Sequence, residues 1–147
     1  MIKSLLVYLN VIFLSLIGFF AGDLVSVDSQ IPSSANPGEA FDLVVTIKKG
    51  SIKEFAKLQM QMPVGFTVQN IDSKGGAFSF SEQTVKVIWT SLPIEEEFQV
   101  KFKVKTFSSV NGNYNIAGKF SYVLEGAKTE AICPNKSITI GTPAAFA

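Results

Sequence analysis

Three lysines occupy alternate positions of one short segment, and they are the first candidates for binding chemistry. Lys101, Lys103 and Lys105 alternate with apolar residues. On a β-strand, alternate side chains lie on one face, so the three ammonium groups would form a cationic row. Such a row could bind a polyanion or an acidic partner. It could also be a solubilising outer face, or a charged guard on an edge strand.

The charge balance of the whole chain favours the solubilising interpretation of this row. Lysine and arginine number 13 and acidic residues 12, and without Lys3 the two counts are equal. A neutral domain has no general field for nucleic acid or anionic lipid. All the cations are lysines, so the bidentate fork by which arginine reads guanine or clamps phosphate is absent from the sequence. We therefore expect no nucleic-acid partner.

Carboxylates are the next candidates for chemistry. The run Glu95-Glu96-Glu97 could attract calcium, but the Asp/Asn/Gly spacing of a dedicated calcium loop is missing, which favours solvated loop charge. Glycoside hydrolysis would need two carboxylates facing each other across a cleft, and no pair is singled out by the sequence. Histidine is absent, which excludes Ser-His-Asp and Cys-His catalysis and the usual zinc ligand sets. We expect no catalytic residue, no metal site and no cofactor.

Aromatic residues could form a flat platform for sugars. Phe78, Phe80 and Phe107 flank loops rich in glycine and serine, and an exposed pair among them would be a binding patch. Trp89, the only tryptophan, shares the parity of Val85 and Val87, which predicts a place in the core.

Cys133 is the only cysteine, so an internal disulfide is impossible. It lies in an apolar segment, which favours a small buried side chain. An intermolecular disulfide is the alternative.

The elements that would position these residues have a period of two. The alternation of apolar and polar side chains in 98–105 recurs in 41–47, 58–62, 85–89 and 114–122, and shorter runs lie between them. The segments between these runs contain residues typical of turns, such as Asn36-Pro37-Gly38 and Asn111-Gly112-Asn113. About nine short runs with one apolar face predict a single antiparallel β-sandwich of seven to nine strands over residues 23–141. A closed barrel is the structural alternative.

The two ends of the chain are of a different kind. Residues 1–22 combine Lys3, an apolar stretch and the small residues Ala21 and Gly22 at the end, which is typical of a secretory signal peptide. The alternative is a short uncleaved membrane anchor, which would be the chain's only contact with a membrane. We expect an exported protein in the periplasm, on the cell surface or outside the cell. Residues 142–147 are expected to be a C-terminal tail.

Three segments of the predicted sandwich also carry a family pattern. They are Asn36–Val45, Leu58–Phe66 with its Pro63-Val64-Gly65 turn, and Trp89–Pro93 followed by the strand 98–104. These segments resemble bacterial exported immunoglobulin-like sandwiches, including cohesin-like domains and adhesin repeats. The resemblance implies a fold more than a ligand.

These observations favour a non-catalytic exported module that binds protein or serves as a structural subunit of a cell-envelope or surface assembly, including adhesion. The expected partner is another envelope or surface protein, docked at a sheet face or added as a strand to a sheet edge. The expected edges are 98–105 and 137–140. A carbohydrate-binding module, with polysaccharide as the ligand, is the alternative, and a periplasmic hydrolase is a third interpretation.

Overall fold

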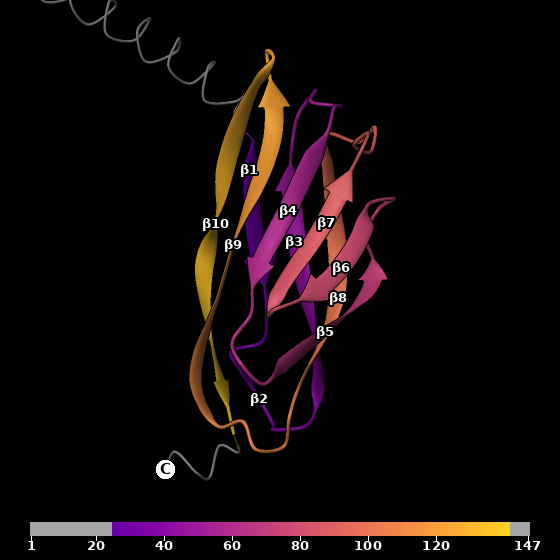
Figure 1. The fold of residues 1–147 in the computed structure, drawn as a ribbon. Helices are drawn as coiled ribbons and strands as arrows, with labels where there is room; N and C mark the ends of the chain where they lie inside the picture. The colour runs from indigo at the N-terminus through magenta and orange to yellow at the C-terminus, as the bar shows by residue number, and fades with distance from the viewer. Residues whose placement is uncertain (1–24, 142–147) are drawn as a thin grey trace, which may run out of the picture.

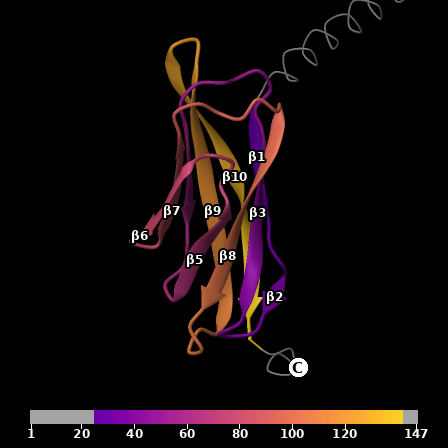
Figure 2. The ribbon, with the colours of Figure 1, turned by 90° about the vertical axis from the view of Figure 1, so that its right-hand side faces the viewer.

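Two β-sheets pack face to face in the computed structural model, which describes residues 25–141 (Figures 1 and 2). The predicted signal peptide 1–22 and tail 142–147 lie outside these residues. Among the residues so described, no helix is long and apolar enough to cross a membrane. The predicted fold class, an all-β sandwich, is confirmed.

Within residues 25–141, ten strands form the two sheets. The four-stranded sheet has the order β1 (Ser26–Gln30), β3 (Ala40–Lys48), β8 (Glu97–Thr106) and β5 (Phe66–Asp72). The six-stranded sheet has the order β2 (Ser34–Ala35), β10 (Ala127–Ile140), β9 (Gly112–Leu124), β4 (Ala56–Gln61), β7 (Thr84–Trp89) and β6 (Ala77–Ser81).

The alternation in the sequence determines which side chains fill the space between the sheets. Along β8, exposed and buried residues alternate at every position, and the buried set includes Phe98 and Phe102. The same parity buries Leu43 and Val45 on β3. Burial of this apolar layer is the main stabilising term of the domain.

Trp89, the last residue of β7, is buried in this core, as its parity predicts. It is 1% exposed, and its ring makes edge contacts with Phe98 and Phe120. The indole nitrogen donates to the backbone oxygens of Ser73 and Lys74, at 3.1 and 3.2 Å. One side chain therefore packs the core and holds the turn between β5 and β6.

The observed connections differ from the expected ones in three respects. The count is ten because the two-residue β2 pairs with the end of β10, and this pair is parallel. The expected edge at 98–105 is wrong, because β8 lies between β3 and β5. The expected edge at 137–140 is wrong for its second half, because Thr139 and Ile140 pair with β2 on one side and β9 on the other, whereas Ser137 and Ile138 pair with β9 alone. Periodicity predicts the face of a side chain, whereas the neighbours of a strand depend on distant segments.

Cys133 is 1% exposed on β10, in agreement with the interpretation of a small buried side chain. Burial, the largest cause, raises the pKa of its thiol.

A buried lysine in the β3–β4 loop was not predicted. Lys49 is 1% exposed, and its ammonium group donates to the backbone oxygens of Gly50 and Ile52, at 3.3 and 2.8 Å. Desolvation by burial, followed by repulsion from Lys53, lowers its pKa, while Glu95 and Glu96 act in the opposite direction. The side chain therefore holds the first part of the β3–β4 loop together.

Lys49 should therefore make the protein more stable as the pH is raised towards 10.5. Its pKa in the folded protein is below 10.5, the value for an unperturbed lysine. Between these two pKa values the unfolded chain binds more protons, so the free energy of unfolding rises with pH. Urea unfolding from neutral pH upwards should show this rise in the natural protein relative to Lys49→Met. Lys128→Met controls for the loss of one positive charge. A constant difference between the natural protein and Lys49→Met would contradict the prediction.

Candidate binding surfaces

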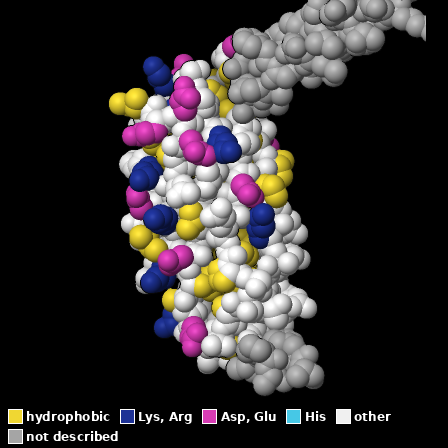
Figure 3. Space-filling view, turned by 180° about the vertical axis from the view of Figure 1, so that it is seen from behind, with side chains coloured by type: hydrophobic (Ala, Val, Ile, Leu, Met, Phe, Trp, Pro, Cys, Tyr) yellow, Lys and Arg dark blue, Asp and Glu magenta, His cyan; other side chains and the backbone are white. Residues whose placement is uncertain are grey.

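The predicted lysine row lies on the outer face of the four-stranded sheet. Lys101, Lys103 and Lys105 are exposed on β8. Their neighbours include acids, because Lys103 is in register with Asp42 and Lys101 with Asp72. Figure 3, which views this side of the molecule, shows lysines and acidic residues interspersed. The row is therefore part of a face of mixed charge.

The predicted aromatic patch is not formed as an exposed group. Phe78 and Phe80 are half-buried on β6 and pack against the core, where the rings of Phe78 and Phe102 lie 5.7 Å apart. Phe107 is 60% exposed and follows the end of β8. The other exposed aromatic side chain in the described region is Phe55, at 48%, in the β3–β4 loop. Since β3 and β8 are antiparallel, Phe55 and Phe107 lie at opposite ends of the sandwich.

The outer face of the six-stranded sheet has a different charge balance. On its outward strand positions the structure places one acid, Glu130, among lysines from separate strands. We call these lysines the basic face: Lys57 of β4, Lys86 of β7, Lys119 of β9 and Lys128 of β10. Glu130 lies 3.6 Å from the ammonium nitrogen of Lys119 and 4.0 Å from that of Lys128.

Strand register holds these lysines in a compact arrangement. Gln59 of β4 is directly opposite Lys86 on one side and Lys119 on the other. Neighbouring strands lie about 4.8 Å apart, so the two lysine backbones are separated by about 10 Å. Lys57 lies two residues before Gln59, on the same face. Ammonium groups so spaced can meet the carboxylates of one acidic surface.

A recess of about 260 Å³ adjoins the basic face. It is lined by Phe55, Lys57, Ser121, Tyr122, Val123 and Lys128. Ser121 is 5% exposed, and its hydroxyl has no hydrogen-bond partner among the described residues. The oxygen of this hydroxyl is itself buried beneath the surface of the recess. The recess combines an aromatic wall and two cations, which suits an acidic side chain with an apolar stem.

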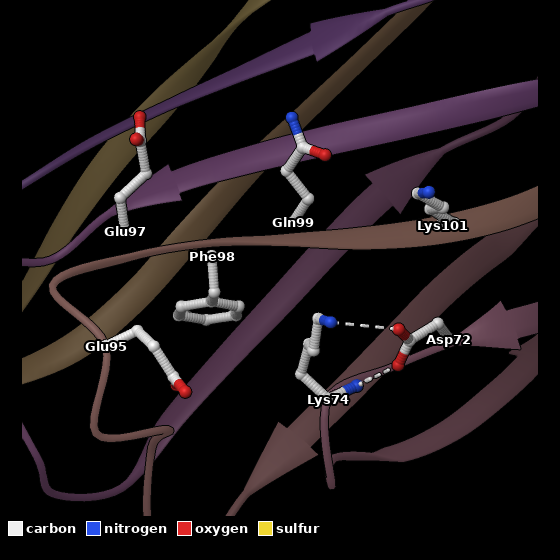
Figure 4. Close-up of a pocket in the computed structure, with 7 residues that line it drawn as sticks. All are labelled: Asp72, Lys74, Glu95, Glu97, Phe98, Gln99 and Lys101. Carbon is white, nitrogen blue, oxygen red and sulfur yellow. Dashed lines mark hydrogen bonds and ion pairs between the residues drawn. The ribbon is translucent and has the colours of Figure 1, made fainter.

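A second recess, of about 440 Å³, lies between the β5–β6 turn and the β7–β8 loop (Figure 4). Asp72 accepts a hydrogen bond from the backbone nitrogen of Lys74 at 3.0 Å, and the Lys74 ammonium nitrogen lies 3.1 Å from its carboxylate. These hydrogen bonds, the backbone one first, lower the pKa of Asp72. Glu95 and Glu97 point to different sides of the chain in Figure 4. Within residues 25–141, no three His, Cys, Asp or Glu side chains are grouped so that they could hold a metal ion.

Comparison with known proteins places the fold. A non-cellulosomal cohesin from the hyperthermophilic archaeon Archaeoglobus fulgidus superposes with a TM-score of 0.55 at 14% identity, over 83% of this chain and 95% of the cohesin. The fold is an immunoglobulin-like β-sandwich. A CARDB domain from Pyrococcus furiosus, solved in complex with di-metal ions, gives a TM-score of 0.50 at 17% identity, over 80% of this chain and 93% of the domain. No model of a protein family matches the chain, and no curated protein matches it. At these identities the likeness shows the fold alone.

Sequence reasoning missed the basic face of this sandwich. Its lysines come from four different strands, so no run of the sequence brings them together. The lysine row is conspicuous in the sequence because its members are two residues apart. The sequence does indicate that Lys57, between Ala56 and Leu58, points outwards. Only the strand order shows that it lies beside lysines of other strands.

Proposed function

We propose that the chain is an exported, non-catalytic protein-binding module, a small subunit of a cell-envelope or surface assembly. Its partner is a protein with an acidic surface. The observation that carries this proposal is the basic face on the six-stranded sheet, with the recess beside Ser121 at its border. The fold, which is similar to a cohesin, and the apolar segment at 1–22 support the protein-binding and exported parts of the proposal.

The basic face suits an acidic protein in both charge and composition. Complementary charge accelerates association and disfavours wrong partners. Ile88 and Ile132 are exposed beside the lysines, and Phe55 lies at the border, so apolar contacts are available between the charges. A mixture of apolar contacts and a polar rim is the usual anatomy of a protein interface.

Two matched triple variants test the proposal by capture of the tagged full-length protein from envelope fractions of its host. One variant replaces Lys57, Lys86 and Lys128 by glutamine, and the other replaces the lysine row. Both remove three positive charges from the outer face of one sheet. We expect the first variant to lose about tenfold or more of its principal acidic protein partner, measured by quantitative mass spectrometry, and the second to retain it.

The opposite pattern would move the docking surface to the four-stranded sheet. Equal retention by both variants would refute docking through lysine charge. Capture should also weaken with added salt, since salt screens exposed charges. Recovery of polysaccharide without a protein partner would favour the carbohydrate-binding alternative, for which a platform of two neighbouring exposed aromatic side chains would be expected.

A further inference from the structure

Both sheets end in edge strands, and most of these edges have features that prevent pairing with a further strand. At β1, Asp28 forms an ion pair of 3.3 Å with Lys136 of β10. The edge strand β5 contains a register shift between Asn70 and Asp72. At one edge of the six-stranded sheet, β2 covers the end of β10. The register of β10 with β9 also shifts there between Cys133 and Lys136, around Pro134. Bulges, charges and prolines are the usual means of blunting an edge.

β6 is the edge strand that has none of these protective features. Its residues Ala77–Ser81 include no charge and no proline, and its register with β7 is continuous from Ala77 opposite Ile88 to Ser81 opposite Thr84. Figure 2 shows β6 at the outer limit of its sheet. Within the described residues β6 pairs with β7 alone, so half of its backbone groups point away from the sheet.

The side chains of β6 are suited to a further strand. Phe78 and Phe80 are only partly buried, so apolar residues of an added strand could pack against the part of each ring that remains accessible. On the other face, Ser79 is small and lies directly opposite Lys86 of β7. An added strand would lie about 10 Å from β7, within reach of a lysine and a glutamate side chain extended over Ser79.

We propose that β6 accepts an extended segment of the acidic partner as a seventh strand of this sheet. The segment alternates apolar residues, packed on Phe78 and Phe80, with acidic residues that face Lys86. Main-chain hydrogen bonds would provide affinity, and the alternate side chains would provide specificity. This inference rests on the proposed function and specifies how the partner engages the basic sheet.

Charge decides between a partner segment and a second copy of this chain. Pairing of β6 with β6 would continue the sheet into another sheet of the same kind, with two basic faces side by side. Lys86 of each copy would then approach the other across a few small residues. Like charges so placed disfavour association, whereas an acidic segment is attracted.

Synthetic peptides of about seven residues that alternate glutamate and valine are the probe for this site. They are added to the full-length protein at up to about 1 mM, and backbone amide exchange is followed by NMR. We expect slower exchange within 77–81 and binding with a Kd below about 1 mM. A peptide with N-methylated alternate amides, which removes the donors along one edge, should not bind. A peptide with lysine in place of glutamate should bind about tenfold more weakly or worse.

A matched pair of variants tests the location. Ser79→Glu places a carboxylate on β6 opposite Lys86, and Gln69→Glu places one on the exposed face of β5. The first should weaken binding of the acidic peptide about tenfold, and the second should leave it unchanged. Absence of peptide binding, equal binding of the N-methylated peptide, protection outside 77–81, or self-association through β6 would each overturn the inference. If Ser79→Glu leaves partner capture intact while loss of the basic-face lysines abolishes it, strand addition fails and the proposed function stands.

Discussion

Replacement of Trp89 by alanine should lower the free energy of unfolding by about 3–5 kcal/mol, the usual range for a fully buried tryptophan. The side chain is 1% exposed and contacts the rings of Phe98 and Phe120. Its removal leaves a cavity between the sheets and leaves the backbone oxygens of Ser73 and Lys74 without their indole donor. Urea unfolding followed by far-ultraviolet circular dichroism measures the change. A loss of this size is a large fraction of the stability of a domain this small.

Two further substitutions separate the contributions of Trp89. Trp89→Phe retains most of the ring packing but removes the N–H donor, so its effect should lie between that of alanine and zero. Phe107→Ala truncates a side chain that is 60% exposed and should change stability by no more than about 0.5 kcal/mol. If Trp89→Ala costs as little as Phe107→Ala, the indole is not part of the core and the face assignment of β7 is wrong.

Gly76→Ala should destabilise the protein by about 1–3 kcal/mol through overpacking. A Cβ atom at this position would meet Cγ1 of Val87 and would lie 2.8 Å from Nε1 of Trp89. The indole cannot move away freely, because the turn carbonyls hold its nitrogen. We expect a lower urea midpoint together with a shifted Trp89 emission maximum, since the ring must be displaced.

A double variant provides the control for Gly76. In the background of Trp89→Phe the smaller ring leaves room for the added methyl group, so the effects of the two substitutions should not be additive. Ser79→Ala, at an exposed position of β6, should have little effect on stability. Additive effects in the double variant would show that the methyl group clashes chiefly with Val87 of β7 and not with the indole.

The faces of the strands could be predicted from the sequence because side-chain parity is a local property. Phe98 and Phe102 lie in the core, and Lys101 lies outside, as their alternation predicts. Strand order is not local. The segment 98–105 has the charges of a guarded edge, yet β3 and β5 flank it on both sides. Its lysines keep the outer face of an interior strand soluble.

The candidate sites show the same division between local and distant information. Phe78 and Phe80 were candidates for a binding patch because they flank a loop rich in glycine and serine, but the strand parity turns both rings inwards. The basic face could not be predicted at all, because each of its strands contributes a single lysine. The burial of Lys49 likewise depends on backbone oxygens that only the folded loop brings within reach.

The parallel pair β2–β10 has a mechanical consequence. The described chain begins beside the end of β3 at Lys48 and finishes at Gly141, at the opposite end of the sandwich (Figure 1). Tension between these two points would pull β1 and β10 along their own lengths. The backbone nitrogens of Thr139 and Gly141 donate to the oxygens of Ser33 and Ala35 at 3.0 and 2.9 Å. These bonds lie across the direction of pull, so they would be loaded together in shear instead of being opened one after another. A pair loaded in shear would need both hydrogen bonds to break at once, so β2 would part from β10 less readily than a pair opened from one end.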